Sequence, residues 1–155
     1  MNIRPMEKRD LDAANHLLMQ VLEVHHQGRP DLFKSGCKKY TDEELFAILE
    51  DESRPIFVAE EAGEVLGYAF CVFLEVKDNN ILTDKKTLYI DDLCVDETAR
   101  RGGVGKALYQ YVRAYAKEQG CYNLTLNVWG CNHSAMGFYE AMGMTVQRTT
   151  MEQIL

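Results

Sequence analysis

A glycine-rich segment, Arg100–Lys106, has the residue types and spacing that point most directly to ligand binding. It reads Arg-Arg-Gly-Gly-Val-Gly-Lys, follows an apolar, β-branched run that ends at Val95, and precedes a pattern typical of an amphipathic helix. Glycines at a strand-to-helix junction permit positive φ angles, so several N–H groups can point outward together. The N-terminal end of the following helix adds partial positive charge. The segment therefore predicts a site for a phosphate or pyrophosphate.

Two adjacent carboxylates, Asp91 and Asp92, interrupt the strand expected over Thr87–Val95. The apolar residues of this strand alternate strictly at first and then switch to the opposite parity; they are Leu88, Ile90, Leu93 and Val95. A β-bulge at Asp91-Asp92 would return all four to one face, because an extra residue shifts the register by one. It would also leave backbone groups unpaired and turn the two carboxylates in a new direction.

The elements that must hold these groups alternate between strand and helix. Strands are expected at Asn2–Arg4, Ile56–Glu60, Val65–Val76, Thr87–Val95, Tyr122–Val128 and Met144–Ile154. Helices are expected from an N-cap at Asp10 to about Gly28, from a Thr41/Glu44 capping box to Leu49, from Val104 to a stop at Gly120, and from Ala135 to Gly143. A helix after each of two central strands predicts an α/β (α+β) fold with a partly parallel sheet covered on both faces.

Length and composition fit one folded domain over residues 1–155. The content is 46% hydrophobic and 26% charged, and the longest apolar run, Tyr68–Leu74, is too short to cross a bilayer. Met1–Pro5 does not resemble the start of a secretion signal, so a cytoplasmic location is expected.

The five cysteines are odd in number and lack C-x-x-C spacing, which predicts reduced, buried thiols; they are Cys37, Cys71, Cys94, Cys121 and Cys131.

The net charge of −7, with a pI near 5.1, disfavours nucleic acid or an anionic membrane as the main partner. It is compatible with a cationic substrate. Asp42, Glu43 and Glu44 add to this charge, but they are best explained as acids that complement a helix dipole.

Two motifs, separated in the sequence, make the functional interpretation of the glycine-rich segment more specific. The first has the pattern Q/R-x-x-G-x-G/A, with Arg100, Gly103 and Gly105 at its defined positions. The second has the pattern N-x-x-A-x-x-F-Y-x-x-x-G-hydrophobic, and its residues are Asn132, Ala135, Phe138, Tyr139, Gly143 and Met144. Together they resemble the GNAT superfamily, whose members transfer an acetyl group from acetyl-coenzyme A to an amine. The resemblance covers most of the chain and implies a mixed central sheet of about six to seven strands.

The resemblance also implies positions for the coenzyme. The pyrophosphate would bind backbone N–H groups of the loop and helix start, namely Arg101, Gly102, Gly103, Val104, Gly105 and Lys106. Backbone groups of Leu93, Cys94 and Val95 would pair with the pantetheine arm like an added strand. Asn132, with Ala135, would contact the arm, and Tyr139 would approach the sulfur. Transfer would be direct within a ternary complex, and no metal is needed.

The chemistry of transfer suggests roles for three side chains. A primary amine has a pKa of about 10.4, so it must lose a proton before it attacks a thioester. Asp91 is preferred as base or amine anchor because related acetyltransferases often carry a glutamate there, while Asp92 and a bridging water are the alternatives. A shared site would raise one carboxyl pKa through like-charge repulsion. Tyr139 is hypothesised to protonate the leaving thiolate, although packing on an apolar helix face would also explain it.

The acceptor side is less specific. The resemblance implies that the first helix and its following loop line the acceptor pocket, which points to His25, His26 and Phe33. Adjacent histidines without a third ligand at suitable spacing do not predict a metal site. Trp129 follows an expected strand and is more readily explained by packing than by substrate recognition.

Three functions remain to be compared. The leading one is an N-acetyltransferase acting on a small amine, such as a polyamine, or on a protein amino group. A non-catalytic acyl-coenzyme A sensor is the alternative, which the presence of Tyr139 disfavours. A nucleotide-binding Rossmann domain fits poorly because the G-x-G-x-x-G spacing is absent. A homodimer is also possible, in which the C-terminal strand ending at Met151–Leu155 pairs across the interface.

Overall fold

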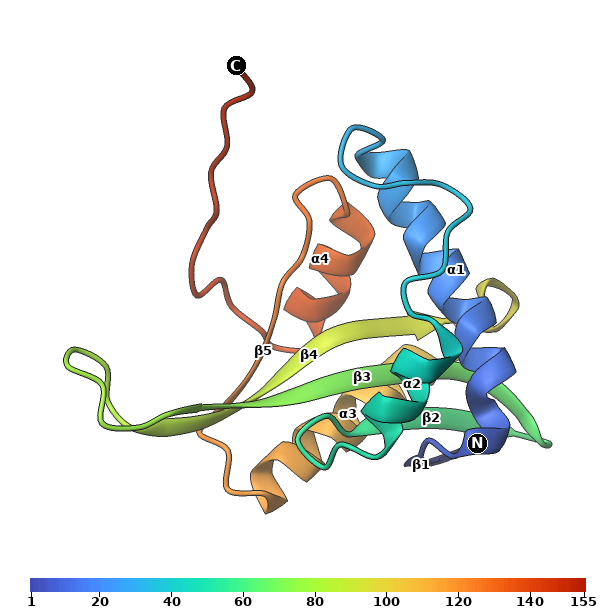
Figure 1. Cartoon of the computed structure of the whole chain (residues 1–155), viewed down its shortest axis with the longest axis horizontal. Helices are drawn as coiled ribbons and strands as arrows, with labels where there is room; N and C mark the ends of the chain where they lie inside the picture. Colours follow the sequence, from blue (N-terminus) through green and yellow to red (C-terminus); the bar gives the residue numbers. More distant parts are fainter.

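Five strands form one mixed sheet in the computed structural model, which describes residues 1–155 (Figure 1). They are β1 (Asn2–Pro5), β2 (Ile56–Glu61), β3 (Glu64–Val76), β4 (Lys85–Val95) and β5 (Asn123–Leu126), in that spatial order. Neighbours are antiparallel from β1 to β4, whereas β5 runs parallel to β4. The predicted α/β architecture with a partly parallel sheet is confirmed.

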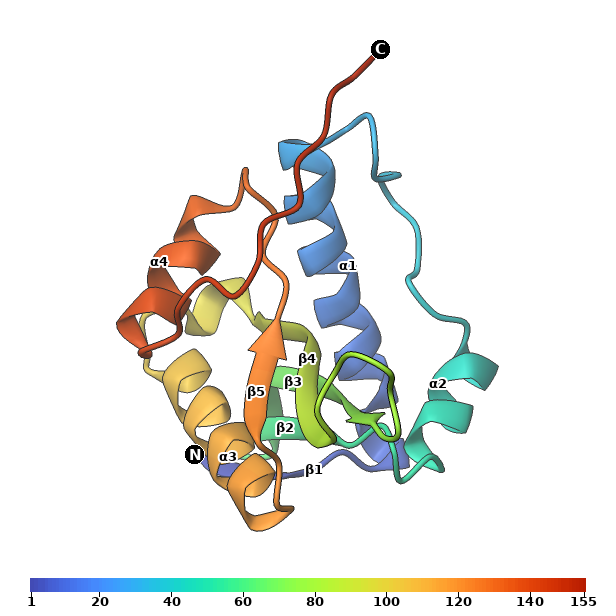
Figure 2. The same ribbon diagram turned by 90° about the vertical axis from the view of Figure 1, so that its left-hand side faces the viewer.

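Helices cover both faces of this sheet (Figure 2). They are α1 (Leu11–Gly28), α2 (Asp42–Leu49), α3 (Val104–Glu118) and α4 (His133–Ala141), with short 3-10 turns η1 (Lys8–Asp10) and η2 (Glu97–Ala99). The apolar residues of α1 and α2 pack on one face, and those of α3 and α4 pack on the other. None of these helices combines the length and apolar character that a membrane crossing requires.

Strand β2 shows why the sheet needs both layers. Four consecutive residues of β2 are buried, and they alternate between the two cores: Ile56 and Val58 face α1 and α2, while Phe57 and Ala59 face α3. Side chains along a strand alternate in direction, so an uninterrupted apolar run requires cover on both faces.

Most local signals predicted from the sequence are confirmed. The Thr41/Glu44 capping box begins α2, with Glu44 N–H donating to Thr41 Oγ1 at 3.2 Å and Thr41 N–H donating to Glu44 Oε2 at 2.8 Å. Gly120 and Gly143 follow α3 and α4 with φ angles of 70° and 88°, the left-handed conformation that ends a helix.

The expected strand at Met144–Ile154 is wrong. These residues form no strand; the segment runs past β5 toward the C-terminal end of α1, where Glu152 forms an ion pair with Arg29 (Figure 2). No strand pairs with it, and Met151 and Ile154 are 86% and 78% exposed. The sheet consequently has five strands rather than six to seven, and β5 is shorter than the expected Tyr122–Val128.

The cysteine prediction holds only in part. All five thiols are free, and Cys71 and Cys94 are buried in strands, but Cys37 and Cys131 are exposed. Both exposed cysteines lie in loops outside the apolar strands, where no core forms around them.

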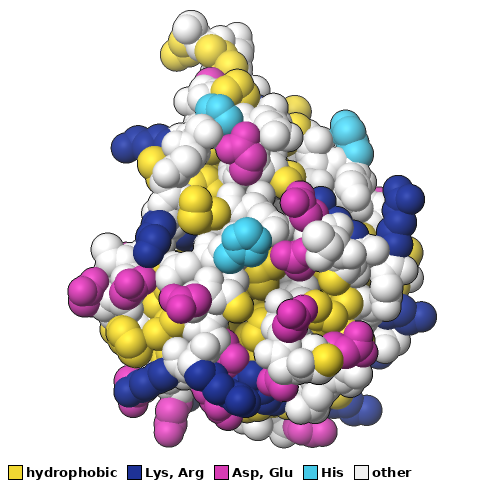
Figure 3. Space-filling view, turned by 90° about the vertical axis from the view of Figure 1, so that its right-hand side faces the viewer, with side chains coloured by type: hydrophobic (Ala, Val, Ile, Leu, Met, Phe, Trp, Pro, Cys, Tyr) yellow, Lys and Arg dark blue, Asp and Glu magenta, His cyan; other side chains and the backbone are white.

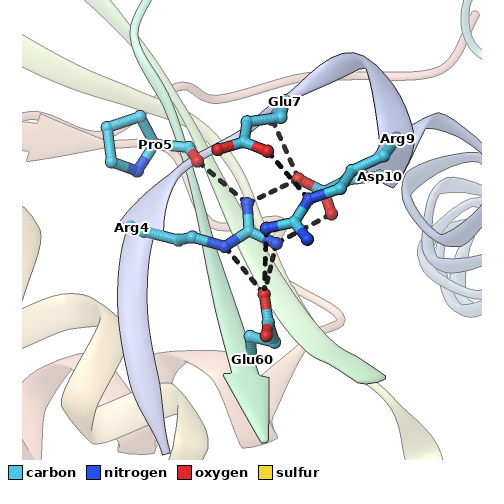
Figure 4. Close-up of polar contacts among 6 residues, drawn as sticks. All are labelled: Arg4, Pro5, Glu7, Arg9, Asp10 and Glu60. Carbon is cyan, nitrogen blue, oxygen red and sulfur yellow. Dashed lines mark hydrogen bonds and ion pairs between the residues drawn. The ribbon is translucent and has the colours of Figure 1, made fainter. Parts of the chain in front are cut away.

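A cluster of ion pairs ties the start of the chain to the sheet (Figure 4). Arg4 on β1 donates to both carboxylate oxygens of Asp10, at 2.7 and 2.9 Å, and its Nε donates to Glu60 on β2 at 2.7 Å. Asp10 occupies the predicted N-cap position of α1 but makes no side-chain cap bond there. Its carboxylate instead accepts from Arg4 and from the Glu7 N–H at 2.8 Å, because the 3-10 turn η1 precedes the helix.

The negative net charge is not gathered into one region on the face shown in Figure 3. Acidic and basic side chains lie interspersed there among apolar ones, and neither sign forms a continuous field.

Candidate active site

The predicted β-bulge lies in the middle of β4. Asp92 pairs with Phe70 on β3, but the next pair is Ile90 with Cys71, so Asp91 has no partner in the ladder. The four apolar residues whose spacing changes across Asp91-Asp92 all contact the core under α3. Leu88 and Ile90 are buried, and Leu93 and Val95 are partly buried against it. The bulge is therefore confirmed together with the reason for predicting it.

Beyond the bulge, one edge of β4 has no neighbouring strand. The pairing of β4 with β5 ends at Ile90 and Leu126, after which the chain leaves β5 toward α4. The part of β4 from Asp92 to Val95 is paired with β3 on one side only. Its backbone groups on the other side can pair with an extended ligand.

The glycine-rich segment forms a turn with two left-handed residues, Arg101 at φ 67° and Gly103 at φ 83°. No hydrogen bond in the structure uses the backbone N–H of Gly103, Val104, Gly105 or Lys106, and the first turn of α3 contains no acidic residue. Four free N–H groups at a helix start form a suitable anion site.

One N–H group of the predicted cradle already has a partner within the chain. The N–H of Gly102 donates to the carbonyl of Ala99 at 3.3 Å, so it closes the turn rather than pointing outward. The side chain of Arg100 lies against the end of β4, where its Nε donates to the carbonyl of Val95 at 3.3 Å.

The two sequence motifs meet at Gly105. A Cβ placed on Gly105 would lie 3.4 Å from Val95 Cγ2 and 3.5 Å from Phe138 Cζ. The start of α3, the end of β4 and the middle of α4 are therefore in contact. At the start of α4, Asn132 is the N-cap, with its Oδ1 accepting from the Ala135 N–H at 3.1 Å. That bond occupies the Ala135 N–H and leaves the Asn132 amide group without a partner in the chain.

Asp91 and Asp92 lie together under two residues of the segment between α1 and α2. Lys39 Nζ lies 3.1 Å from Asp91 Oδ2 and 3.4 Å from Asp92 Oδ2. The Tyr40 hydroxyl donates to Asp91 at 3.2 Å, and the Tyr68 hydroxyl of β3 donates to Asp92 at 3.3 Å. The Asp91 side chain is 30% exposed and that of Asp92 only 8%.

This difference in burial separates the two carboxylates chemically. Burial raises the pKa of Asp92, while the Lys39 charge opposes the shift and the Asp91 charge adds to it. The predicted like-charge repulsion is thus a smaller cause than burial. For Lys39, burial lowers the pKa, but the charges of Asp92 and Asp91 outweigh it, so the pKa of Lys39 is raised and its amine is held as a cation.

Tyr139 packs against other aromatic rings and is close enough to Asp92 for the charge of that carboxylate to affect its pKa. Its ring centroid lies 5.0 Å from that of Phe138 and 6.3 Å from that of Tyr109. Burial raises the pKa of Tyr139, and the negative charge of Asp92 raises it further. Its hydroxyl makes no hydrogen bond within the chain. No fully buried side-chain oxygen or nitrogen lacks a partner, so this hydroxyl is accessible from outside the core. The hydroxyl is therefore free to donate to a ligand.

The expected acceptor residues are brought together. Phe33 lies edge-on to Trp129 at 5.1 Å between ring centroids, and 5.0 Å from the ring of His25. His26 Nδ1 lies 2.7 Å from the Phe33 carbonyl, so it holds the loop. Burial lowers the pKa of His25, and the Asp92 charge partly offsets this. The end of α1, its following loop and the loop after β5 thus form one wall near the carboxylates.

Sequence reasoning missed the residues that contact the carboxylates, namely Lys39, Tyr40 and Tyr68. Lys39 and Asp91 are 52 residues apart, and nothing in the pattern around Lys39 distinguishes it from the neighbouring Lys38. Only the path of the loop brings its amine to the bulge.

Comparison with known proteins decides the family. The Acetyltransferase (GNAT) family model matches residues 18–144, which include the bulge, the glycine-rich turn and α4. The chain belongs to the GNAT acetyltransferase family. It is accordingly an acyltransferase of a family that uses acetyl-coenzyme A.

Individual relatives agree with the assignment. This GNAT enzyme is 33% identical over 144 residues to an uncharacterized N-acetyltransferase of Bacillus subtilis, covering 92% of this chain and 89% of the relative. A solved tetramutant of a Bacillus halodurans protein is 31% identical with a TM-score of 0.95, covering 100% of both chains. An aminoglycoside N-acetyltransferase solved in complex with CoA has 18% identity and a TM-score of 0.73, covering 99% of this chain and 98% of that one, which shows the shared fold.

Proposed function

We propose that this GNAT enzyme acetylates a cationic primary amine by direct transfer from acetyl-coenzyme A in a ternary complex. The observation that carries the proposal is the position of two carboxylates at the bulge of β4, where its edge becomes free. Near the end of that strand begins a helix whose first N–H groups are unpartnered. Donor and acceptor would therefore meet at Asp91-Asp92.

The donor would lie along the free edge of β4. Its pyrophosphate would bind the N–H groups of Gly103–Lys106, where the dipole of α3 favours an anion by about 0.3–1 kcal/mol. The nearby Arg101 side chain adds positive charge. The pantetheine arm would pair with the backbone of Leu93–Val95, next to the unpartnered amide of Asn132. This arrangement directs the thioester toward the bulge.

We assign the base role to Asp92 and the anchoring role to Asp91. A general base works best when its pKa approaches the working pH, and burial moves the pKa of Asp92 in that direction. Asp91 is more exposed and accepts from Tyr40, which suits a group that binds an ammonium. This assignment reverses the preference drawn from the sequence, because burial could not be read there.

Transfer would then begin with deprotonation of the amine. The amine gives a proton to Asp92, directly or through water, and its nitrogen attacks the carbonyl carbon of the thioester. Backbone N–H groups beside the bulge stabilise the oxyanion. When the carbon–sulfur bond breaks, Tyr139 donates a hydrogen bond to the thiolate, which takes up the second proton that the nitrogen loses as the amide forms. A raised pKa keeps the Tyr139 hydroxyl protonated for this purpose.

The acceptor we favour is a small polyamine-like molecule. A cation fits two carboxylates, and the rings of Phe33 and Trp129 can contact an alkyl chain or hold a second ammonium over an aromatic face. The test is release of free coenzyme A thiol from acetyl-coenzyme A with polyamines, amino acids, aminoglycosides and peptides offered separately. Release only with peptides would replace the small-amine assignment by protein acetylation. Coenzyme binding without transfer to any amine would favour the sensor.

We also propose that the enzyme is a homodimer through its C-terminal segment. Residues Met151, Ile154 and Leu155 are 86%, 78% and 112% exposed and have no strand beside them, although their sequence is partly apolar. A second copy could supply that strand. Light scattering should give a dimer for the full chain and a monomer after removal of residues 146–155. A monomeric full chain would contradict the proposal.

A further inference from the structure

Lys39 is the lysine that the fold holds at the candidate reaction centre. Its Nζ contacts Asp91 Oδ2 at 3.1 Å and Asp92 Oδ2 at 3.4 Å, and it lies 5.3 Å from the centre of the Tyr40 ring. The side chain is 35% exposed, so it is only partly covered. Two carboxylates and an aromatic face form the environment that an acceptor ammonium would need.

The group bound there is itself a primary amine. We propose that Lys39 is a modification site at which the enzyme acetylates its own chain. The inference rests on the proposed function, because it places the side chain of Lys39 in the ammonium position of the acceptor. It goes further by naming one particular acceptor amine, which is attached to the enzyme's own chain.

The step needs only the reactants of the proposed transfer. Asp92 takes a proton from the Lys39 ammonium, and the free Nζ attacks the thioester carbonyl. A carbon–nitrogen bond forms and the carbon–sulfur bond breaks, and the departing thiolate of coenzyme A takes up the second proton, which the nitrogen loses as it becomes an amide. The products are Nε-acetyl-Lys39, coenzyme A and one proton. No oxidant, reductant or metal is required for this balance.

Proximity distinguishes Lys39 from its neighbour. Lys38 Nζ pairs with Asp42 at 3.4 Å on the surface of α2, where both side chains are more than half exposed. It has no contact with either carboxylate of the bulge. Because a group held beside the reacting centre gains effective concentration, enzymatic acetylation should select Lys39, while Lys38 reports the background reaction with the thioester.

Acetylation would change the site that performs it. An amide carries no charge, so both ion pairs of Lys39 would be lost. The loop between α1 and α2 would then be held to β4 mainly by the Tyr40–Asp91 hydrogen bond and the stacking of Tyr40 on Phe70 at 6.0 Å. The carboxylates would become available to an added amine.

The test is a time course with acetyl-coenzyme A alone, read by peptide mass spectrometry at Lys39 and Lys38. We expect Lys39 to be acetylated at least about tenfold faster than Lys38. The rate constant should not depend on protein concentration, since the reaction is within one chain. Lys39→Arg should abolish the fast modification and Lys38→Arg should preserve it. Asp92→Asn should slow it by about 100-fold.

The outcomes separate this inference from the proposed function. Equal rates at Lys39 and Lys38, with an added amine still acetylated, would overturn self-acetylation and leave the proposed function intact. A rate that rises in proportion to protein concentration would overturn the intramolecular step. Failure of transfer both to Lys39 and to every added amine, with acetyl-coenzyme A bound, would overturn the two together.

Discussion

The ammonium nitrogen of Lys39 lies 3.1 Å from the carboxylate of Asp91, although the two residues are 52 positions apart in the sequence. One of these residues is in the segment that follows α1, and the other is the unpaired residue of the β4 bulge. Because of this contact, the Lys39 ammonium occupies the position that we propose for the ammonium group of the acceptor. A competing amine must displace Lys39 before it can reach the base.

Replacing Lys39 by Met should therefore improve acceptor binding. Methionine keeps an unbranched side chain but cannot occupy the ammonium position. We expect KM for a small amine to fall by up to about tenfold, because a larger fraction of the enzyme is competent to bind it. Initial rates measured against amine concentration check this. Lys38→Met is the matched control and should leave KM unchanged, and a raised KM in Lys39→Met would show that Lys39 assists binding.

The pH dependence of kcat/KM should report Asp92. Transfer needs the ionised carboxylate, so kcat/KM falls as pH decreases through the raised pKa of Asp92. Because the Lys39 charge lowers that pKa, Lys39→Met should move the acidic limb to higher pH. Profiles between about pH 5 and pH 9 with one amine would measure the shift. Asp92→Asn should lose most of its activity. An acidic limb that stays in place in Lys39→Met would exclude Asp92 as its origin.

Tyr139→Phe should lower kcat by about 100-fold, the lower range for loss of a general acid. KM for acetyl-coenzyme A should change little, since the ring and its packing remain. Steady-state kinetics and calorimetric binding of the coenzyme check the two statements. Tyr109→Phe is the matched control, because Tyr109 packs 6.3 Å from Tyr139 but has no proposed role. Equal effects of the two substitutions would assign the loss to packing.

How much the sequence could predict is clear from β4. The change of parity between Ile90 and Leu93 predicted the bulge, because side-chain direction along a strand is a local property. The contact with Lys39 could not be predicted in this way, since it depends on where a long loop crosses the sheet. The order of the two base candidates was also inaccessible, because burial of Asp92 comes from residues distant in sequence, such as Tyr68.

The C-terminal segment shows that a local pattern can also predict an element that does not form. Alternation at Met144–Ile154 predicted a strand, but a strand forms only beside an edge with free backbone groups. The outer edge of β5 is free, but β5 is only four residues long, and the C-terminal segment does not pair with it: Glu152 instead forms an ion pair with Arg29 after α1. Local pattern therefore gave the propensity without the partner.

Gly103→Ala should damage both the turn and coenzyme binding. Gly103 has a φ of 83°, which an alanine adopts at a cost of roughly 1–2 kcal/mol. We expect a lower Tm and a weaker affinity for coenzyme A, because the strained turn would displace the N–H groups at the start of α3. Thermal unfolding and calorimetry measure the two effects. Gly130→Ala is the control, since its φ is not positive and no atom lies within 4 Å of an added Cβ. Unchanged coenzyme affinity in Gly103→Ala would place the pyrophosphate elsewhere.

The ion pair between Arg4 and Asp10 makes stability depend on pH, separately from activity. Asp10 is 5% exposed and lies at the junction of β1 with α1. The hydrogen bond from Arg4 lowers the pKa of Asp10, against the effect of burial. A carboxyl whose folded pKa is lowered stabilises the fold above its unfolded pKa of about 3.9, and this contribution is lost as pH falls through the folded pKa.

Asp10→Asn should therefore lower the free energy of unfolding at neutral pH by about 3 kcal/mol, because Arg4 keeps its charge and loses its main partner. The difference from the unmodified chain should shrink as pH falls below about 4, where Asp10 becomes protonated in the unfolded state, and should vanish below its lowered folded pKa, where Asp10 is protonated in both states. Urea unfolding at several pH values measures this. Asp12→Asn, at an exposed position in the first turn of α1, is the control and should change stability by less than about 0.5 kcal/mol. A difference for Asp10→Asn that stays constant down to low pH would mean that packing, rather than the ion pair, explains the loss.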